Sequence, residues 1–352
     1  MSIKYANIYQ ELLSDIRRGK FKNGDKIYTE HQIMEKYKVS RITAQKALNN
    51  LSADGYIKRL VGKGSFVTFD LSFPDYNENV FTPSFVSLIM ANQLQTLSFI
   101  HGIEQYLSTE SIQTAISLTN NDPKLELDAV KKAVSGNTKG IIFYPCEPFV
   151  NDEIFGNLIR DGFPLAFLDR APIDLPCNCI TTDGFSGGYM ATKHLLDKGH
   201  RKIAIFNSGF DIFETVKHRY AGYCCAMRDY GVPVNPSYVL ECYHSSNCGR
   251  ELLMSSDPPT AIFCTNDSVA LDIYNTAYSL GKVIPDDISI IGFDNLPVAS
   301  QLIPALTTIE QPFSKMGIEA AKVVLNHNNS GSYVKMYLPV KLIERSSVKD
   351  MR

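Results

Sequence analysis

Residues 40–51 read SRITAQKALNNL, a serine followed by eleven residues with the spacing of an amphipathic helix. Ser40 stands at the N-cap position of that helix. The apolar face consists of Ala44, Ala47, Leu48 and Leu51, and the outward face near the N-terminus carries Arg41, Thr43, Gln45 and Lys46. Side chains of these four types reach phosphates and base edges when a helix end enters the major groove of DNA. The stretch therefore predicts a recognition helix.

The neighbouring residues predict a second helix and a hairpin. Residues 28–37 begin with polar side chains and continue with apolar ones on one face of a short helix. Residues 56–61 and 65–67 have the character of strands, and Gly62-Lys63-Gly64 between them forms a tight turn. Residues 1–70 are therefore expected to form a winged helix-turn-helix.

In order and spacing, residues 4–69 resemble the GntR family of bacterial regulators. The similarity is carried by Glu30, by Ser40-Arg41-Ile42-Thr43 and by the run from Gly62 to Val67. The resemblance implies DNA contacts from Arg41 and Thr43 on the recognition helix and from Gly62 and Lys63 in the wing. The full set of candidate DNA-contacting residues is Thr29, Glu30, His31, Ser40, Arg41, Thr43, Gln45, Lys46, Gly62, Lys63 and Gly64.

This sequence departs from the usual GntR pattern at three positions. His31 and Gln45 stand where family members often carry arginine, and Tyr28 replaces a common proline. These departures bear on which operator sequence is read. The alternative interpretation of the whole segment is a helix-and-strand module that serves protein interaction.

The charge distribution favours the DNA interpretation. Residues 1–70 contain 13 Lys and Arg against 7 Asp and Glu, whereas residues 71–352 contain 22 against 30. The net charges are +6 and −8, and the whole-chain value of −2 hides this asymmetry. A positively charged N-terminal segment suits the phosphate backbone, and the rest of the chain does not.

The composition is that of a globular protein and argues against a membrane protein. The 352 residues are 44% hydrophobic and 20% charged, which is typical of a globular protein with two or three cores. No run of about eighteen apolar residues occurs, and the N-terminus leads directly into an amphipathic helix, so we expect a cytoplasmic protein without membrane contact.

Cysteine and histidine spacing argues against cofactors and catalysis. The eight cysteines include no Cys-x-x-Cys pair and no zinc spacing with histidine, so we expect mostly buried thiols and no metal or other cofactor. A redox role for the adjacent Cys224 and Cys225 is the alternative. The sequence contains neither His-Glu-x-x-His nor a Gly-rich phosphate loop with Lys and Ser/Thr, so we do not expect an enzyme.

The rest of the chain predicts a linker followed by an α/β body. Residues 71–83 contain Pro74 and Pro83 without a sustained period and are expected to form the linker. Expected strands are 85–90, 112–118, 140–145, 164–168, 202–206, 238–242, 260–264, 288–292 and 306–309, and expected helices are 96–108, 123–135, 151–161, 184–198, 216–230, 266–280 and 314–326. Such alternation predicts parallel sheets with helices on both faces, and the number of strands favours two lobes. We assign 84–182 with 311–328 to one lobe and 183–310 with 329–352 to the other.

Polar side chains follow several of these strands. They are Asp169 and Arg170, Asn266 and Asp267, Asp294 and Asn295, and Gln311, while Arg219 lies near the start of a helix. Parallel sheets bind ligands beyond the carboxyl ends of their strands. Carboxylates, amides and arginines suit a polyhydroxylated ligand, because each hydroxyl both donates and accepts. Taken singly, each residue can also be a helix cap, a turn residue or half of a surface ion pair.

Across about residues 84–347, the body resembles the LacI/GalR repressors and the periplasmic sugar-binding proteins. The similarity is carried by stretches such as Thr265-Asn266-Asp267, Pro285 through Asp294, and Leu306 through Pro312. It implies a cleft lined by Asp169, Arg170, Arg219, Asn266, Asp294 and Gln311. It also implies further contacts from residues 92–99 and from Tyr144. The chain has no tryptophan, so the aromatic that stacks on the sugar must be Phe99, Tyr144, Tyr243 or His244.

The combination of a GntR-type DNA-binding domain with a LacI-type body resembles the arabinose-utilisation repressors of Gram-positive bacteria. The resemblance implies a homodimer that binds a near-palindromic operator and is released by a monosaccharide, with a pentose such as arabinose favoured. The alternative is a regulator whose body responds to a phosphorylated carrier protein or to a non-sugar metabolite.

Overall fold

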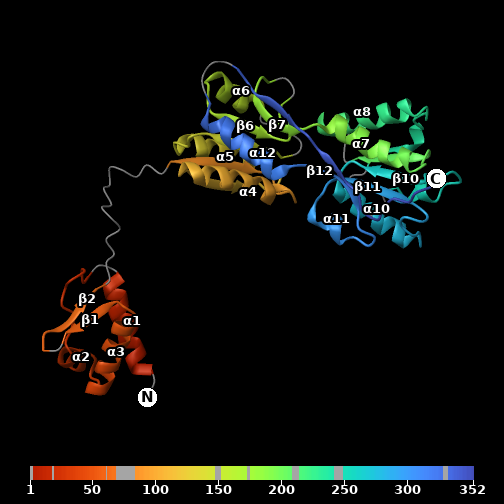
Figure 1. Cartoon of the computed structure of the whole chain (residues 1–352). Helices are drawn as coiled ribbons and strands as arrows, with labels where there is room; N and C mark the ends of the chain where they lie inside the picture. The colour runs from red at the N-terminus through yellow and green to blue at the C-terminus, as the bar shows by residue number, and fades with distance from the viewer. Residues whose placement is uncertain are drawn as a thin grey trace. The chain divides into compact units, whose positions relative to one another are not determined.

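The computed structural model describes residues 3–17, 20–60, 62–68, 84–146, 152–172, 175–207, 214–241, 249–327 and 332–352. The chain divides into two compact units, Met1–Thr82 and Pro83–Arg352, each of which is described by itself (Figure 1). The expected linker, residues 71–83, lies outside the described residues.

The first unit is a helical domain with a two-stranded wing. Its elements are α1 (Ile3–Arg17), α2 (Glu30–Tyr37), α3 (Arg41–Ala53), β1 (Ile57–Leu60) and β2 (Gly64–Val67). The strands pair antiparallel, with Ile57 opposite Val67. The four apolar positions expected on α3 are all buried, against Ile8, Leu12 and Ile16 of α1 and Ile33 of α2. The winged helix-turn-helix expected from the sequence is thereby confirmed.

Side-chain caps fix where α2 and α3 begin. The Thr29 hydroxyl accepts a hydrogen bond from the Gln32 backbone N–H, and the Gln32 side chain accepts one from the Thr29 N–H. The Ser40 hydroxyl accepts a hydrogen bond from the Thr43 N–H at 3.4 Å. Lys38, between the helices, adopts a left-handed conformation with φ of 49°. These caps satisfy N–H groups that a helix leaves unpaired at its start, so the turn and the start of α3 are set locally.

The first lobe of the second unit contains a six-stranded sheet in the order β13-β7-β6-β5-β3-β4, with every pair parallel. The strands are β3 (Phe85–Met90), β4 (Gln113–Leu118), β5 (Ile141–Tyr144), β6 (Leu165–Leu168), β7 (Asn178–Thr182) and β13 (Lys335–Leu338). Helices α4 (Thr96–Leu107) and α12 (Phe313–Leu325) pack on one face, and α5 (Pro123–Ser135) and α6 (Asp152–Arg160) pack on the other. Both faces are covered, so its inner strands are buried.

The second lobe repeats this design in the order β14-β12-β11-β10-β8-β9, in which only the pair β12–β14 is antiparallel. The strands are β8 (Ile203–Asn207), β9 (Val239–Glu241), β10 (Ala261–Cys264), β11 (Ser289–Asp294), β12 (Thr307–Glu310) and β14 (Lys341–Ile343). Helices α7 (Gly184–Asp197) and α8 (Glu214–Asp229) cover one face, and α9 (Arg250–Leu253), α10 (Asp267–Ser279) and α11 (Pro297–Gln301) cover the other. The two-lobed body with parallel sheets that the sequence predicts is thereby confirmed.

The chain passes between the lobes at β7–α7, at β12–α12 and at β13–β14. The sequence assigns residues 329–352 to the second lobe, and this is wrong for β13, which pairs with β7 in the first sheet. Strands β7, β13 and β14 were not expected either. Strand β7 (NCITT) has one strongly apolar residue, and β13 and β14 are only four and three residues long, so only the assembled sheets reveal their pairing.

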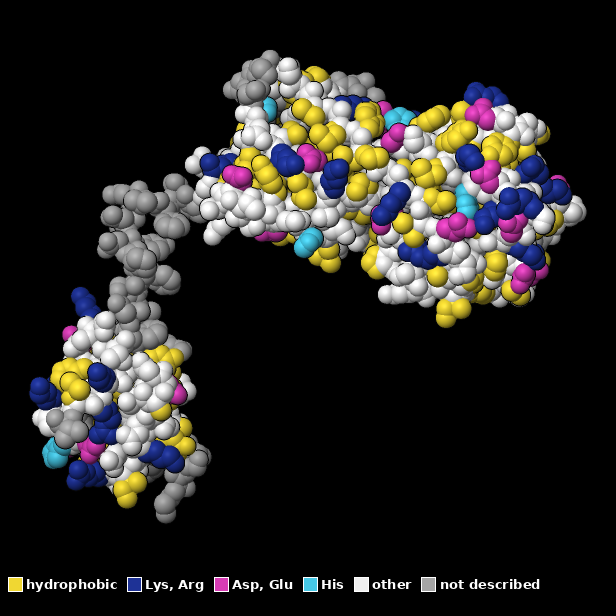
Figure 2. All heavy atoms as spheres, viewed as in Figure 1, with side chains coloured by type: hydrophobic (Ala, Val, Ile, Leu, Met, Phe, Trp, Pro, Cys, Tyr) yellow, Lys and Arg dark blue, Asp and Glu magenta, His cyan; other side chains and the backbone are white. Residues whose placement is uncertain are grey.

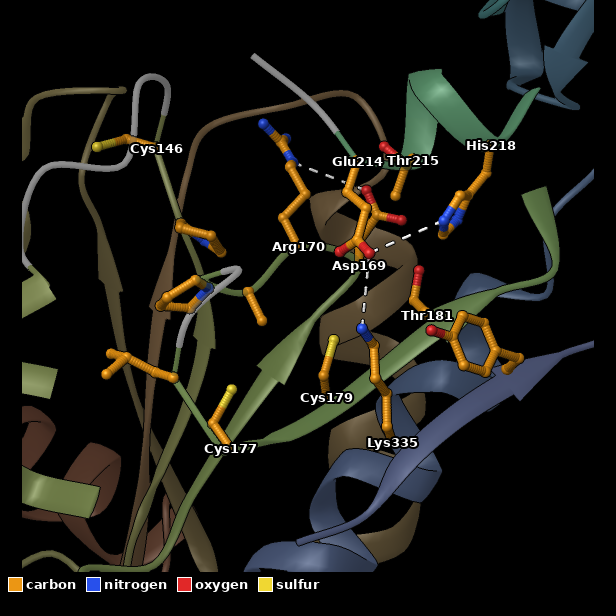
Figure 3. Close-up of a pocket in the computed structure, with 15 residues that line it drawn as sticks. Cys146, Asp169, Arg170, Cys177, Cys179, Thr181, Glu214, Thr215, His218 and Lys335 are labelled. Atoms are coloured by element: carbon orange, nitrogen blue, oxygen red, sulfur yellow. Dashed lines mark ion pairs between the residues drawn. The ribbon is translucent and has the colours of Figure 1, made fainter. Parts of the chain in front are cut away.

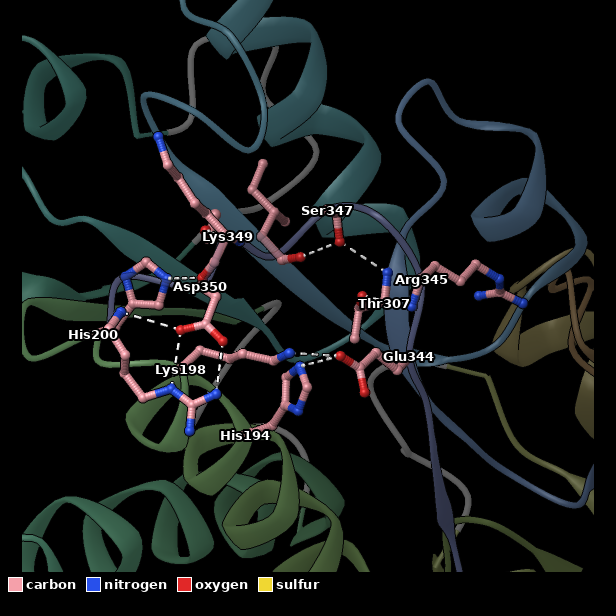
Figure 4. A network of polar contacts seen from close by, with 12 residues as sticks. His194, Lys198, His200, Thr307, Glu344, Arg345, Ser347, Lys349 and Asp350 are labelled. Atoms are coloured by element: carbon pink, nitrogen blue, oxygen red, sulfur yellow. Dashed lines mark hydrogen bonds and ion pairs between the residues drawn. The ribbon is translucent and has the colours of Figure 1, made fainter.

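The last residues of the chain belong to the second lobe (Figure 4). The fully buried Ser347 hydroxyl donates to the Ile290 carbonyl at 2.6 Å and accepts from the Thr307 N–H at 2.8 Å. The Met351 N–H donates to the Lys198 carbonyl at 2.7 Å. Residues 345–352 therefore strap β11 and β12 to the end of α7. In the described part of the chain, we find no helix of the length and apolarity that crossing a bilayer requires.

Candidate functional site

Polar groups from the first lobe gather where β5 and β6 end. Asp169 and Arg170 directly follow β6, and Asp169 adopts a left-handed conformation with φ of 62°. Arg170 lies over the Tyr144 ring, 4.8 Å from its centre, and donates to the Tyr144 hydroxyl at 2.6 Å. The Gln95 amide donates to the same hydroxyl at 2.5 Å. Burial raises the pKa of Tyr144, so its hydroxyl stays protonated and can donate to a ligand.

The second lobe contributes a buried arginine and carboxylate. Arg219, on α8, is only 5% exposed, and its guanidinium lies 3.9 Å from the centre of the Phe293 ring. Its Nη1 donates to the Thr265 carbonyl at 2.5 Å and lies 3.9 Å from Asp294 Oδ1. Asp294 ends β11 with a φ of 114°, a strained conformation for a residue other than glycine. Such strain at a strand end is typical of a functional site.

Gln311 connects these groups to the passage between the lobes. Its amide donates to Asp294 Oδ1 at 2.6 Å, and its carbonyl accepts from the Thr182 hydroxyl at 2.5 Å. Thr182 ends β7 in the first lobe, and Gln311 directly follows β12 in the second. The hydrogen-bonded chain from Asp294 to Thr182 therefore runs from one lobe to the other.

The charges of the two lobes act on one another. Burial raises the pKa of Asp169, and Arg219 in the other lobe opposes that shift. Burial also raises the pKa of Asp294, which Arg219 lowers and Asp169 raises further. The buried Asp169 Oδ1 and Arg219 Nε have no hydrogen-bond partner. Such atoms cost free energy, and a ligand hydroxyl between the lobes would satisfy them.

The remaining residues expected in the cleft divide into three cases. Asn266 caps α10, where its side chain accepts from the Val269 N–H at 2.8 Å. Phe99 is fully buried between Tyr144 and Phe313, with ring centres 5.1 and 5.2 Å away, so it supports Tyr144 from within the core. His244 lies outside the described residues, as does Tyr243.

Asp267, grouped with Asn266 at a strand end, has a structural role. Its carboxylate accepts from the Thr308 hydroxyl and from the Leu296 N–H, each at 2.7 Å. Burial raises its pKa to about 8, and the nearby Asp294 adds to that effect. Its oxygens are thus used to join α10 to β12 and to the start of α11.

Beside Asp169 and Arg170, residues of both lobes enclose a cavity of about 110 Å³ (Figure 3). Its wall consists of Pro145, Cys146, Asp169, Arg170, Ala171, Pro172, Leu175, Cys177, Cys179, Thr181, Glu214, Thr215, His218, Lys335 and Tyr337. Apart from Asp169 and Arg170, these positions are absent from the expected cleft set, and four of them, Cys179, Thr181, Lys335 and Tyr337, belong to the unexpected strands β7 and β13. Among the described residues, no group of three or more His, Cys, Asp or Glu is arranged to hold a metal ion.

In the first unit, the exposed Arg41 at the start of α3 is tied to an acidic partner. Its Nε donates to Glu30 at 3.1 Å, and Arg59 of the wing binds the other oxygen of the same carboxylate. Hydrogen bonds from Arg59 and Arg41 lower the pKa of Glu30, so it stays ionised. Glu30 therefore joins α2, α3 and the wing, and Arg59, which the sequence did not single out, belongs to this group.

Figure 2 shows several basic side chains on the visible face of the first unit. Gln45, Lys46, Gly62, Lys63 and His31 are exposed, and Gly64 and Thr43 are half-buried. Lys46 also lies 4.2 Å from the centre of the Tyr5 ring. Gly62 and Gly64 have φ values of 72° and 116°, which other residues rarely adopt, so the wing turn needs both glycines.

Comparisons with known proteins agree with both halves of this arrangement. Residues 4–67 match the model of bacterial regulatory proteins of the gntR family, and residues 192–348 match the periplasmic binding protein-like domain. The chain is 30% identical to the arabinose metabolism transcriptional repressor of Geobacillus stearothermophilus, over 99% of this chain and 98% of that protein. It is also 30% identical to the repressor of the same name from Halalkalibacterium halodurans, over 93% of this chain and 89% of that protein.

A solved structure extends the agreement to the fold of the body. The LacI family transcriptional regulator from Enterococcus faecium, with bound ribose, is 26% identical and has a TM-score of 0.66 over 76% of this chain and 100% of that one. The chain belongs to the transcriptional repressors that join a GntR-type DNA-binding domain to a LacI-type body. Its full-length relatives are repressors of arabinose metabolism, a family of regulators and not of enzymes.

Proposed function

We propose that this repressor leaves its operator when a monosaccharide, most favourably a pentose such as arabinose, binds in the cleft between the lobes. The observation that carries the proposal is the buried group of Asp169, Arg219 and Asp294. It places charged atoms from both lobes within electrostatic reach of one another, and it leaves two of those atoms without hydrogen bonds. A polyhydroxylated ligand supplies donors and acceptors together.

Related proteins favour a pentose among the sugars. The full-length relatives are named for arabinose metabolism, and the Enterococcus faecium regulator binds ribose. Asn266, Gln311 and Tyr144 add amide and hydroxyl groups at the same strand ends. The carrier-protein alternative does not explain why these polar groups converge inside the body.

The sugar would act by favouring one closure angle of the lobes. Because its partners come from both lobes, it binds most tightly where they are close enough to share it. A hundredfold preference for the state that cannot bind the operator corresponds to about 2.7 kcal/mol, within the usual range of allosteric coupling.

A homodimer in the cytoplasm would present two recognition helices to two half-sites. The candidate contact surface in the first lobe is the edge strand β4 with the start of α4, where Leu97, Ile116 and Leu118 are exposed. In a monomer, exposed apolar side chains on an edge strand favour unwanted association with other chains, so such a surface is typical of an interface. The DNA contacts we propose are the exposed and half-buried residues around Arg41.

Two measurements test the proposal. A duplex selected by the protein from a random-sequence library serves as operator, and its release is followed by fluorescence anisotropy while pentoses and hexoses are added. Isothermal titration then measures the affinity of each sugar. Release of the operator and binding heat with at least one monosaccharide support the proposal. If no sugar of the panel binds or releases the operator, and a phosphorylated carrier protein binds, the alternative is favoured.

A further inference from the structure

The cavity beside Asp169 and Arg170 has the properties of a second binding subsite. Its volume of about 110 Å³ is several times the roughly 10–15 Å³ that one water molecule requires. Strands β7 and β13 of the first lobe form one side, and the first turn of α8 in the second lobe forms the other (Figure 3). The cavity therefore exists only while the lobes are close together.

Two buried polar atoms in its wall have no hydrogen-bond partner. They are Oδ1 of Asp169 and Oγ1 of Thr181, and the two residues are 9% and 5% exposed. A buried acceptor without a partner costs about 1–3 kcal/mol. A ligand that brings hydroxyl groups to both atoms would recover this free energy, so the wall favours a hydroxylated occupant.

The charges in the wall balance. Arg170 Nε lies 3.7 Å from Asp169 Oδ2, and Lys335 Nζ lies 3.7 Å from Glu214 Oε1. His218 Nε2 lies 3.8 Å from the same Glu214 oxygen. Each carboxylate in the wall is thus paired with a cation. No unpaired cation of these pairs remains to bind a phosphate, and no unpaired carboxylate remains to bind an ammonium group. The cavity suits an uncharged ligand.

Part of the wall is apolar. It is formed by Pro172, Leu175, Cys177 and Cys179 together with neighbouring residues. Burial raises the pKa of Cys177 to about 11, so its thiol stays protonated and uncharged. A sugar ring has hydroxyl groups at its edges and apolar C–H faces, and it suits a wall that contains both polar and apolar side chains.

The cavity continues the proposed sugar cleft. Asp169 and Arg170 belong to both, and Glu214, Thr215 and His218 lie within the turn and a half of α8 that precedes Arg219. A substituent that leaves the bound sugar on the side of Asp169 therefore enters the cavity. The ion pair between Lys335 and Glu214 joins the two lobes across this space.

We propose that the cavity is a second subsite that takes a neutral, hydroxylated substituent joined to the sugar in the cleft. The body then binds a glycoside of more than one ring, such as a disaccharide, more tightly than it binds the free monosaccharide. This inference rests on the proposed function, because it needs a sugar in the cleft. Filling both subsites adds contacts from each lobe and strengthens closure.

The test compares each monosaccharide with a disaccharide of the same sugar. Isothermal titration of the full chain uses arabinose with arabinobiose, xylose with xylobiose, and galactose with galactobiose. For the sugar that binds, we expect the disaccharide to bind at least about tenfold more tightly. Cys177→Leu fills the cavity and should remove this gain while leaving the monosaccharide affinity within about twofold. Thr181→Val removes the hydroxyl without changing the shape and should lower the disaccharide affinity alone, about fivefold.

Cys225→Leu, the same substitution on α8 outside the cavity wall, is the matched control, and thermal melting shows whether each variant folds. If every disaccharide binds no more tightly than its monosaccharide, the second subsite is wrong while the monosaccharide function stands. If the wild-type protein binds neither member of any pair, the proposed function fails and this inference fails with it. Equal weakening of both sugars by Cys177→Leu, in a folded variant, also overturns the subsite.

Discussion

Replacing Arg219 with methionine is expected to weaken sugar binding strongly while leaving operator binding unchanged. Methionine keeps an unbranched, largely apolar side chain as far as about the Nε position, but it removes the guanidinium that lies over the Phe293 ring, with its charge and its N–H donors. The Nη1 donor of Arg219 is used by the Thr265 carbonyl, whereas its buried Nε has no partner. The sugar would therefore lose a charged donor that the protein itself does not use.

The size of the effect follows from two contributions. A hydrogen bond from a charged group contributes about 1.5–3 kcal/mol, which corresponds to a roughly 10- to 150-fold loss of affinity. In addition, Arg219 lowers the pKa of Asp294. Without this cation the buried carboxyl group holds its proton more tightly, so Asp294 loses acceptor capacity for a sugar hydroxyl. Both contributions act in the same direction.

The assay is isothermal titration of the sugar, combined with anisotropy of the labelled operator. Arg228→Met is the matched control, because Arg228 lies on the same helix but its side chain is 75% exposed. Operator affinity should stay at the wild-type value in both variants, because the DNA-binding residues belong to the separate first unit. Normal release of the operator by sugar in folded Arg219→Met would refute the reasoning.

Three further predictions concern DNA binding, pH and stability. Arg41→Ala should lower operator affinity by about 1–3 kcal/mol, as loss of a bidentate base contact does, and leave sugar affinity unchanged; equal operator affinity by anisotropy would contradict the assignment. Burial raises the pKa of Asp267 to about 8, so the folded protein binds a proton that the unfolded chain, with a pKa of about 4, releases. The free energy of unfolding should therefore fall as the pH rises between these values, and chemical denaturation of Asp267→Asn should show a weaker fall. Ser347→Ala leaves the buried Thr307 N–H and Ile290 carbonyl without the serine hydroxyl and should lower the free energy of unfolding by about 1–3 kcal/mol; an unchanged denaturation midpoint would show that the C-terminal strap is not structural.

Local signals in the sequence were sufficient for the DNA-binding unit. The capping position Ser40, the apolar face of α3 and the two glycines of the wing each act over a few residues, so their pattern is visible along the chain. The role of Arg59 was not visible in the same way. It depends on β1 approaching both α2 and α3, and no local period records that approach.

For the body, the sequence predicted most strands but missed β7. Its residues Asn178 to Thr182 are mainly polar or cysteine, and yet all five are buried. They are buried because β6 and β13 pair on either side of the strand, and β13 arrives from more than 150 residues further along the chain. The Asn178 amide in this strand donates to the Leu165 carbonyl and accepts from the Val334 N–H, whereas the Thr181 hydroxyl has no partner.

The sequence by itself determined the two kinds of domain, the positions of most helices and strands, and the polar residues at the strand ends, because periodicity, caps and turns are local properties. Only the tertiary structure decided which of those residues meet. In the folded chain, both Asp267 oxygens accept hydrogen bonds from the second lobe, and Phe99 packs against Tyr144. Asp169 lies close enough to Arg219 of the other lobe for their charges to interact. The tertiary structure also formed the cavity between β7, β13 and α8, whose wall no single stretch of the chain contains. The physical reason is that burial and electrostatic coupling depend on distances in space, and three passages of the chain between the lobes set those distances.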